Sequence, residues 1–353
     1  MNNKGPVIRW DKGTAYDLFV SLRVIHRPDE FGLRPSWAAG VRSRIPAHLR
    51  ETLDQAHKFI PIPLGWLYAL PDPKDATTAV QALASVPPEE CLSTLLFDTK
   101  QDQDSQRFHE FLLTLNGKQR LTSSIETKIK SLRPAGSKVT QEYTRACFNA
   151  WSDRQTFGDL LFQAIKAYEK NFFKEEEPRI LAAQSAALET AKSMAEELGV
   201  LSALEELSSG VRMDWASSLG KLILAPTFWG APFVFYDALN ANTGIILFGA
   251  RPQGTTLVPG DLVPEDLLTA LKALADPTRL RILRYLQDSP CTPSELAHLL
   301  RLRAPTVTHH LRILRLAGLV QVTVTQESER CYAARAEGLK QSVQHLKSFI
   351  SGA

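Results

Sequence analysis

The stretch that most constrains this chain of 353 residues is 293–320, which reads PSELAHLLRLRAPTVTHHLRILRLAGLV. It begins with the signals of a helix start. Thr292 can cap the helix with its hydroxyl, Pro293 stands where a missing N–H costs nothing, and Glu295 can return a capping-box hydrogen bond to Thr292. We therefore predict a short first helix, whose apolar face consists of Leu296, Leu299 and Leu300.

A second helical pattern follows after a tight basic connection. Val307, Leu311 and Leu314 form one apolar stripe at helical spacing, and Gly318 is placed to end the helix in a left-handed conformation. The same helical wheel turns four residues away from the core, namely Pro305, Thr306, His309 and Arg312. Two short amphipathic helices in this arrangement predict a helix-turn-helix, with residues 304–317 as the recognition helix.

Two β-type runs follow the second helix, at residues 321–325 and 331–335. Between them lies a turn of acidic and basic residues, 326–330, so the pair is expected to form a hairpin. A recognition helix followed by a β-hairpin is the pattern of a winged helix-turn-helix. We place this domain at residues 264–353.

Four segments of this domain can be compared with known families: 274–283 (LADPTRLRIL), 294–297 (SELA), 306–311 (TVTHHL) and 314–320 (LRLAGLV). Together they resemble the ArsR-type family of bacterial transcription regulators. The resemblance covers roughly residues 264–350, about a quarter of the chain, and depends on the segments jointly because each is short. It implies that the domain binds double-stranded DNA.

Helical patterns flank the motif at residues 265–275, 277–287 and 336–350, and Asp276 is placed to cap the second of them. In the family that the domain resembles, the first and last helices form the interface of a homodimer. The unpaired apolar stripes here would suit that role, and the alternative is that they pack onto the N-terminal part of the chain. The stripe of the last helix consists of Leu339, Val343, Leu346 and Ile350.

The charge distribution also points to the C-terminal region. The formal net charge is +3; residues 261–353 contain 12 Lys and Arg against 9 Asp and Glu, whereas residues 1–260 contain 29 of each. No acidic residue lies between Leu296 and Gln326, where four arginines and three histidines occur. A stripe of one charge sign on a predicted recognition helix is expected where a protein contacts a phosphate backbone.

A recognition helix contacts base edges with side chains near its N-terminus, because the major groove accommodates a helix and exposes distinct donors and acceptors. We predict Thr306, Thr308, His309 and Arg312 as base or near-base contacts. Arg312 suits guanine because a guanidinium can bond two acceptors at once. His310 lies beside the buried stripe, so a structural role is as well supported as DNA contact.

The other arginines are better suited to setting register than to reading sequence. We predict phosphate contacts for Arg301, Arg303 and Arg315, and a minor-groove contact at the wing for Arg330. Two glutamates beside Arg330 make the wing nearly neutral. For each of these arginines the alternative is a solvated surface charge.

The domain departs from the family at two places. Metal-sensing members have a cysteine pair in the helix before the recognition helix, whereas residues 291–297 read CTPSELA, with one cysteine. A soft-metal thiolate site needs at least two ligands, so we expect no arsenic or zinc site there, and we predict no metal or cofactor elsewhere. The turn commonly reads Gly then Ser in the family but has Arg301 and Arg303 here. A helix N-cap is therefore missing, and a glycine-like backbone angle is not assured.

The sequence pattern of residues 1–250 indicates mainly helices, and near the end of this range it changes to short β-type runs. The runs 221–228, 232–237 and 244–249 are short β-type segments separated by turn residues. They predict a small antiparallel sheet at about 219–249, and the Pro- and Gly-rich residues 251–263 predict a linker. The expected fold class is mainly α with small β: a helical N-terminal domain with a short antiparallel sheet, then the C-terminal winged helix-turn-helix domain.

We interpret the N-terminal domain as either a sensing domain or a scaffold for assembly. Residues 222–232, just before the hairpin, resemble a group of long ArsR-like regulators with a large helical N-terminal domain. This implies that residues 1–250 sense an effector or assemble the protein, although no residue identifies a small-molecule effector. We expect a transcription regulator acting as a repressor, but the residues do not distinguish repression from activation.

The competing hypothesis is an enzyme in residues 1–250, with the winged helix as a protein-docking module. The chain contains none of GxSxG, GxxxxGK[ST], HExxH and GxGxxG, so we expect no enzyme, although catalysis does not require these motifs. No apolar run approaches the ~20 residues of a membrane span, and the N-terminus lacks the apolar core of a signal peptide. We therefore expect a cytoplasmic protein with no membrane partner.

Overall fold

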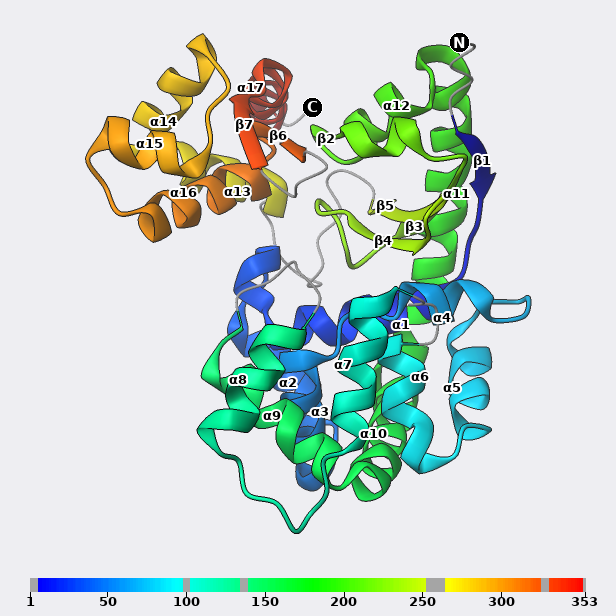
Figure 1. The fold of residues 1–353 in the computed structure, drawn as a ribbon. Coiled ribbons are helices and arrows are strands. Elements are labelled where there is room, and N and C mark those ends of the chain that lie inside the picture. The colour runs from blue at the N-terminus through cyan, green and yellow to red at the C-terminus, as the bar shows by residue number, and fades with distance from the viewer. Residues whose placement is uncertain (1–5, 98–101, 134–138, 252–263, 325–329, 352–353) are drawn as a thin grey trace.

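A computed structural model of the chain describes residues 6–97, 102–133, 139–251, 264–324 and 330–351 (Figure 1). The described chain is mostly helical, with two small sheets. This agrees with the predicted fold class, mainly α with small β. Among the described residues, no helix is both long enough and apolar enough to cross a bilayer.

The N-terminal half is a layered assembly of helices that covers one face of a sheet (Figure 1). Short helical turns interrupt it at η1 (Pro28–Phe31), η2 (Pro88–Glu90), η3 (Glu169–Phe173) and η4 (Asp214–Ser218). Its helices are α1 (Thr14–His26), α2 (Pro35–Ser43), α3 (Ala47–Phe59), α4 (Leu64–Ala69), α5 (Ala76–Ala84), α6 (Cys91–Phe97), α7 (Gln103–Leu113), α8 (Ser123–Leu132), α9 (Gln141–Ser152), α10 (Arg154–Tyr168), α11 (Lys174–Leu198) and α12 (Val200–Leu207).

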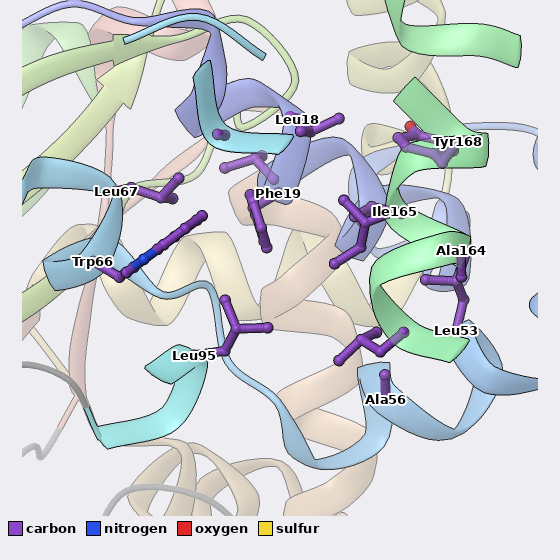
Figure 2. Packing of buried hydrophobic residues seen from close by; sticks show 14 of the residues in the cluster. Leu18, Phe19, Leu53, Ala56, Trp66, Leu67, Leu95, Ala164, Ile165 and Tyr168 are labelled. Carbon is purple, nitrogen blue, oxygen red and sulfur yellow. The ribbon is translucent and has the colours of Figure 1, made fainter. Parts of the chain in front are cut away.

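Helix α1 is the centre of this half, because nearly all of its side chains are buried. Figure 2 shows Leu18 and Phe19 of α1 packed among side chains from α3, α4, α6 and α10. The carboxylate of Asp17 is fully buried and accepts hydrogen bonds from the Thr227 hydroxyl at 2.7 Å and the Gln184 amide at 2.7 Å. Two backbone N–H groups, of Phe228 and Trp229, also donate to it at 2.9 Å. Desolvation raises the pKa of Asp17, and these four donors offset part of that cost.

The sheet of the N-terminal half contains β1 (Val7–Trp10), β3 (Lys221–Thr227), β5 (Thr243–Gly249) and β4 (Phe235–Asn240), in that spatial order. Strands β1, β3 and β5 are parallel, and only β4 is antiparallel to its neighbour. The predicted purely antiparallel sheet is therefore wrong. The chain leaves β3, forms the edge strand β4 and returns through β5 beside β3, so β3 and β5 run in the same direction. A first strand from residues 7–10 then joins the free edge of β3.

Alternate residues of the two central strands face two different cores. Ile223 and Ile245 point into the helical core of the N-terminal half. Leu224 and Ile246 point to the other face, where they join a cluster that contains residues of the C-terminal domain. Because side chains alternate along a strand, a sheet with two covered faces has continuous apolar runs, as the sequence shows.

The C-terminal domain is a winged helix. Strands β6 and β7 form the antiparallel wing, and a short strand of the N-terminal half, β2 (Val211–Met213), adds to β6 in parallel. The elements are α13 (Glu265–Leu274), α14 (Pro277–Asp288), α15 (Pro293–Leu300), α16 (Ala304–Leu316), β6 (Val320–Val324), β7 (Arg330–Ala334) and α17 (Ala336–Ser351).

Packing is continuous between the two halves of the chain. One apolar cluster combines Val211 and Leu224 with Ile282, Leu311 and Val320. The predicted linker falls almost entirely on residues 252–263, which lie outside the described residues. The division into two domains therefore stays a prediction, whereas a packed and hydrogen-bonded contact between the halves is observed.

Candidate nucleic-acid interface

The first helix of the motif starts as its sequence predicts. The Thr292 hydroxyl accepts a hydrogen bond from the backbone N–H of Glu295 at 3.3 Å, and the Glu295 carboxylate accepts one from the N–H of Thr292 at 2.8 Å. This reciprocal capping box fixes the first turn of α15. Asp276 likewise accepts from the N–H of Arg279 at 2.9 Å and caps α14.

The turn between α15 and α16 has arginines at two positions where other residues are favoured: glycine favours the left-handed backbone of the first, and serine can cap the helix at the second. Arg301 adopts a left-handed conformation with φ 55° and ψ 43°, which is unusual for a residue with a side chain. Arg303 stands at the N-cap of α16 and makes no side-chain capping bond. Both side chains are exposed at the N-terminal end of α16. The turn thus adopts the glycine-like backbone angle that the sequence left open, although an arginine stands there, and it presents two cations to solvent.

Helix α16 is anchored by the predicted apolar stripe. Val307, Leu311 and Leu314 are at most 1% exposed and pack in the core of the winged helix. At the end of the helix, Gly318 has φ 67°, and the N–H of Leu319 donates to the Leu314 carbonyl oxygen at 3.0 Å. This is the glycine-dependent helix end that was predicted. The opposite side of the helix presents Thr306, Thr308, His309 and Arg312, all of them exposed.

The two histidines have different surroundings. His309 is exposed, whereas His310 is half-buried, and its Nδ1 atom has no hydrogen-bond partner. Desolvation lowers the pKa of His310, with the Asp276 carboxylate acting in the opposite direction. His310 therefore faces the start of α14, which fits the structural role weighed against DNA contact.

Arg312 lies at the point where the N-terminal half meets the exposed face of α16. Its side chain is 48% exposed, and Nη1 lies 3.9 Å from Oε1 of Glu30 in η1. Glu30 also contacts Arg27, with 3.4 Å between Nη1 and Oε1. The carboxylate of Glu30 is thus shared between two guanidinium groups, one of which is a predicted base contact.

The prediction of a phosphate contact for Arg315 is wrong. Arg315 is 5% exposed, and its guanidinium donates to the carbonyl oxygens of Ser208 at 2.6 Å, Ser209 at 3.1 Å and Pro232 at 3.4 Å. Desolvation lowers the pKa of Arg315 to about 10. Because all three acceptors belong to the N-terminal half, this arginine joins the two halves of the chain and does not face solvent.

The wing is described only in part. Arg330 is exposed at the start of β7. The tip of the hairpin, including both neighbouring glutamates, falls on residues 325–329, outside the described residues. The minor-groove contact of Arg330 therefore stays a prediction.

Several residues that contact the recognition helix or the wing could not be identified from the sequence. Glu30, and the backbone carbonyls of Ser208, Ser209 and Pro232, come from segments far from α16 in the chain, and no motif marks them. Arg335, after the wing, adds an ion pair to Glu206 of α12 at 3.1 Å. Only the folded chain brings these groups to the recognition helix.

The cysteines and histidines do not form a metal site within the described residues. No group of three or more His, Cys, Asp or Glu side chains there is arranged to hold a metal ion. Cys291, on the segment where metal-sensing members have their pair, is buried and bonds through its backbone to Tyr332 at 2.8 Å. Its surroundings are those of a structural thiol.

Comparison with known proteins agrees with this geometry. Residues 276–322 match the family model described as "Bacterial regulatory protein, arsR family". The HTH-type transcriptional regulator CmtR of Mycobacterium tuberculosis, and that of Mycobacterium bovis, are 52% identical over 60 residues, which is 17% of this chain and 51% of the relative. The regulator NmtR of Mycobacterium tuberculosis is 42% identical over 55 residues, 16% of this chain and 46% of the relative.

These similarities define the class of the C-terminal region, which is an arsR-type helix-turn-helix. The chain covers about half the length of the curated relatives it matches, and the matches include nothing of residues 1–250. The search of solved structures found no match.

Proposed function

We propose that this protein is a DNA-binding transcription regulator that inserts the N-terminal half of α16 into the major groove. One observation supports this most directly: Thr306, Thr308 and His309 are exposed together on a helix whose opposite face is locked into the core. Arg301 and Arg303 flank that surface at the N-terminal end, where phosphates lie when a recognition helix enters the groove.

We also propose that the active form is a homodimer through α13 and α17. Both helices expose large apolar residues: Leu271 of α13 is 36% exposed and Leu339 of α17 is 47% exposed. Val343 and Ile350 extend this surface along α17, at 44% and 75% exposure. A two-fold dimer would present two recognition helices to half-sites about 34 Å apart, one turn of DNA.

For residues 1–250 we propose a role in effector sensing or assembly and no catalytic activity. Three contacts support the sensing or assembly role: the hydrogen bonds of Arg315, the ion pair of Arg335 and the pairing of β2 with β6. They connect that half directly to the recognition helix and the wing. We further propose that the protein acts in the cytoplasm, since a regulator must reach DNA. We also propose that it acts as a repressor.

Fluorescence anisotropy with the DNA upstream of the gene for this chain tests the proposal. We expect salt-dependent binding that is tighter than binding to unrelated DNA of equal length, and a double variant, His309→Ala with Arg312→Ala, should lose about 10- to 100-fold in affinity.

The matched control is His48→Ala with Arg107→Ala, which removes the same residue types from exposed positions on α3 and α7. Its affinity should stay within about two-fold of the parent. Equal losses in both double variants, or binding that does not respond to salt, would argue against α16 as the reading element.

A further inference from the structure

A cleft of about 570 Å³ lies between the two halves of the chain. The N-terminal half lines it with α11, the end of α12 and the end of β5, and the C-terminal half with α13, α17 and the end of α16. Its volume falls within the roughly 300–1,000 Å³ of sites that hold small organic molecules. A ligand of ordinary size therefore fits, and it would contact both halves at once.

The cleft is open because its walls carry small side chains. Those of α11 follow one face of the helix at intervals of three and four residues: Ala183, Ala186, Ala187 and Thr190. Ala270 of α13 and Ser342 of α17 also line the cleft. Small faces usually allow helices to pack closely, since protein interiors contain few unfilled volumes. Here the walls stay apart, and the space between them is left for a ligand.

The lining favours an aromatic ligand. From Ala183 to Met194 the wall formed by α11 extends over about 16 Å, which is long enough for two rings in line. Alanine side chains form a smooth apolar wall against which a flat ring can lie. Met194 adds a thioether and His345 of α17 adds a ring, and both kinds of group make favourable contacts with aromatic rings.

The charges of the lining balance one another. Two of its described residues are arginines, Arg251 and Arg335, and two are acids, Glu206 and Asp266. Arg335 is engaged within the cleft, with Nη2 3.1 Å from the Glu206 carboxylate and Nη1 3.5 Å from the side-chain oxygen of Gln341. A charged ligand would lose its water without gaining an unpaired counter-ion. The cleft therefore favours an uncharged ligand.

His345 supplies a polar group that the fold itself does not use. It is half-buried on α17, one turn after Gln341, and its ring makes no hydrogen bond or ion pair with another described residue. A neutral imidazole offers one N–H donor and one acceptor nitrogen. It can therefore bond to a hydroxyl or amide group of a ligand.

We propose that this cleft binds an uncharged two-ring aromatic molecule with a hydroxyl or amide group at one end. The rings lie against the alanine face of α11, and the polar group bonds to the ring of His345. This chemistry fits phenols and aromatic amides, and it disfavours the corresponding carboxylates.

The position of the cleft connects the ligand to DNA binding. Leu316, in the last turn of the recognition helix, belongs to its wall, and α13 and α17 are the helices of the proposed dimer interface. A ligand shifts an equilibrium only if it binds two arrangements unequally, and a ligand held between the halves does so when their separation changes. The ligand is thus the effector. This role rests on the proposed DNA-binding function, whereas the binding site itself does not.

Calorimetry on the full chain tests the class of ligand with 4-phenylphenol as the probe. Its counterparts are 4-phenylbenzoate, which carries a charge, and 4-cyclohexylphenol, in which one ring is saturated. We expect 4-phenylphenol to bind about ten-fold more tightly than the carboxylate, because the charge must be desolvated without a partner. It should bind about three-fold more tightly than 4-cyclohexylphenol. A carboxylate that binds as tightly as the phenol would overturn the proposed class.

Two exposed alanines of α11 give a matched pair of variants. Ala186 lines the cleft, whereas Ala182 lies outside its lining. Ala186→Phe fills the cleft and should abolish binding of 4-phenylphenol, while Ala182→Phe should bind it as the parent does. Thr190→Phe, one turn further along the same wall, keeps the test decisive if Ala186→Phe fails to fold. Undetectable binding to the parent, unchanged binding in the folded filling variants, or an equal loss in Ala182→Phe would overturn the site.

The polar contact has its own test. His345→Leu should weaken the binding of 4-phenylphenol about five-fold, as the loss of one neutral hydrogen bond predicts. The matched control is His48→Leu, at an exposed position on α3, which should leave the affinity unchanged. If His345→Leu binds as tightly as the parent, the assignment of His345 as the polar partner is wrong.

DNA titrations separate this inference from the proposed function. If saturating 4-phenylphenol changes the DNA affinity of the parent but not of Ala186→Phe, the effector role is supported. If 4-phenylphenol binds without changing DNA affinity, the effector role is wrong and the site stands. If the parent binds no DNA in any condition, the proposed function and the effector role fail together, while calorimetry still decides the site.

Discussion

The two ends of the recognition helix have opposite surroundings. Its first turns present Thr306 and His309 to solvent, and no described residue of the N-terminal half covers them. Its last turns are held by that half: Arg315 donates to three backbone carbonyls, and Arg312 lies 3.9 Å from Glu30. Arginine is used at both ends of the motif, as an exposed cation at Arg301 and Arg303 and as a buried anchor at Arg315.

This difference shows that residue type does not decide the role of a basic side chain on such a helix. The position relative to the N-terminal half decides it, because that half supplies acceptors at one end and leaves the other end free. Variants at the two ends should therefore separate stability from DNA affinity.

The largest effect is expected for Arg315→Ala. Removing this guanidinium leaves the buried carbonyl of Ser208 and the partly buried carbonyls of Ser209 and Pro232 without this donor, so the free energy of unfolding should fall by about 2–4 kcal/mol. Urea denaturation followed by circular dichroism measures it. Arg303→Ala, at the exposed end, should change the free energy of unfolding by no more than about 0.5 kcal/mol. Equal losses in the two variants would remove the distinction between the ends.

The next effect is on DNA affinity without a change in stability. His309→Ala should weaken binding to the specific site by about ten-fold, because one base-edge contact contributes about 1–3 kcal/mol, and the unfolding curve should match that of the parent. Anisotropy titration and denaturation on the same preparation give both values. A destabilised His309→Ala variant with normal DNA affinity would contradict the assignment of a free reading surface.

A smaller effect of opposite sign is expected for Glu30→Gln. Neutralising this carboxylate frees Arg312 from a competing acceptor and removes repulsion toward phosphates, so DNA affinity should rise by about two- to five-fold. Glu51→Gln, an exposed acid on α3, makes the same change in net charge and should have less effect. If the two variants give the same gain, only net charge is acting and the Glu30 contact is unimportant.

The smallest effect concerns the turn. Arg301→Gly should stabilise the fold by about 0.5–1 kcal/mol, because glycine adopts the left-handed conformation at φ 55° without strain. The same variant removes one predicted phosphate contact, so the slope of log affinity against log salt should fall by about one. Thermal unfolding and salt titrations measure the two changes. No gain in stability would show that the Arg301 backbone is unstrained.

Much of the C-terminal domain is predictable because its signals are local. The capping box of Thr292 and Glu295, the apolar stripe of Val307, Leu311 and Leu314, and the glycine at the end of α16 each act within a few residues. The sequence predicted the identity of these elements, and the family similarity of residues 276–322 agrees with them.

The N-terminal sheet shows where local signals fail. The runs 221–228 and 244–249 are evident as strands, but their parallel pairing depends on β4 returning to the edge and on β1 joining from the start of the chain. A short connection between two strands suggests a hairpin, and nothing in the residues themselves indicates that β3 and β5 are neighbours. Topology is a property of the whole chain.

The sequence alone determined where the recognition helix begins, which of its faces is apolar and that a wing follows, because hydrophobic periodicity and capping act over one or two turns. Only the tertiary structure decided that Arg315 is an anchor, that Glu30 lies beside Arg312 and that His345 borders a cleft. Each of these depends on residues more than 80 positions away or on helices from different parts of the chain. The environment of a charge is set by the groups that folding brings to it, and no local pattern encodes them.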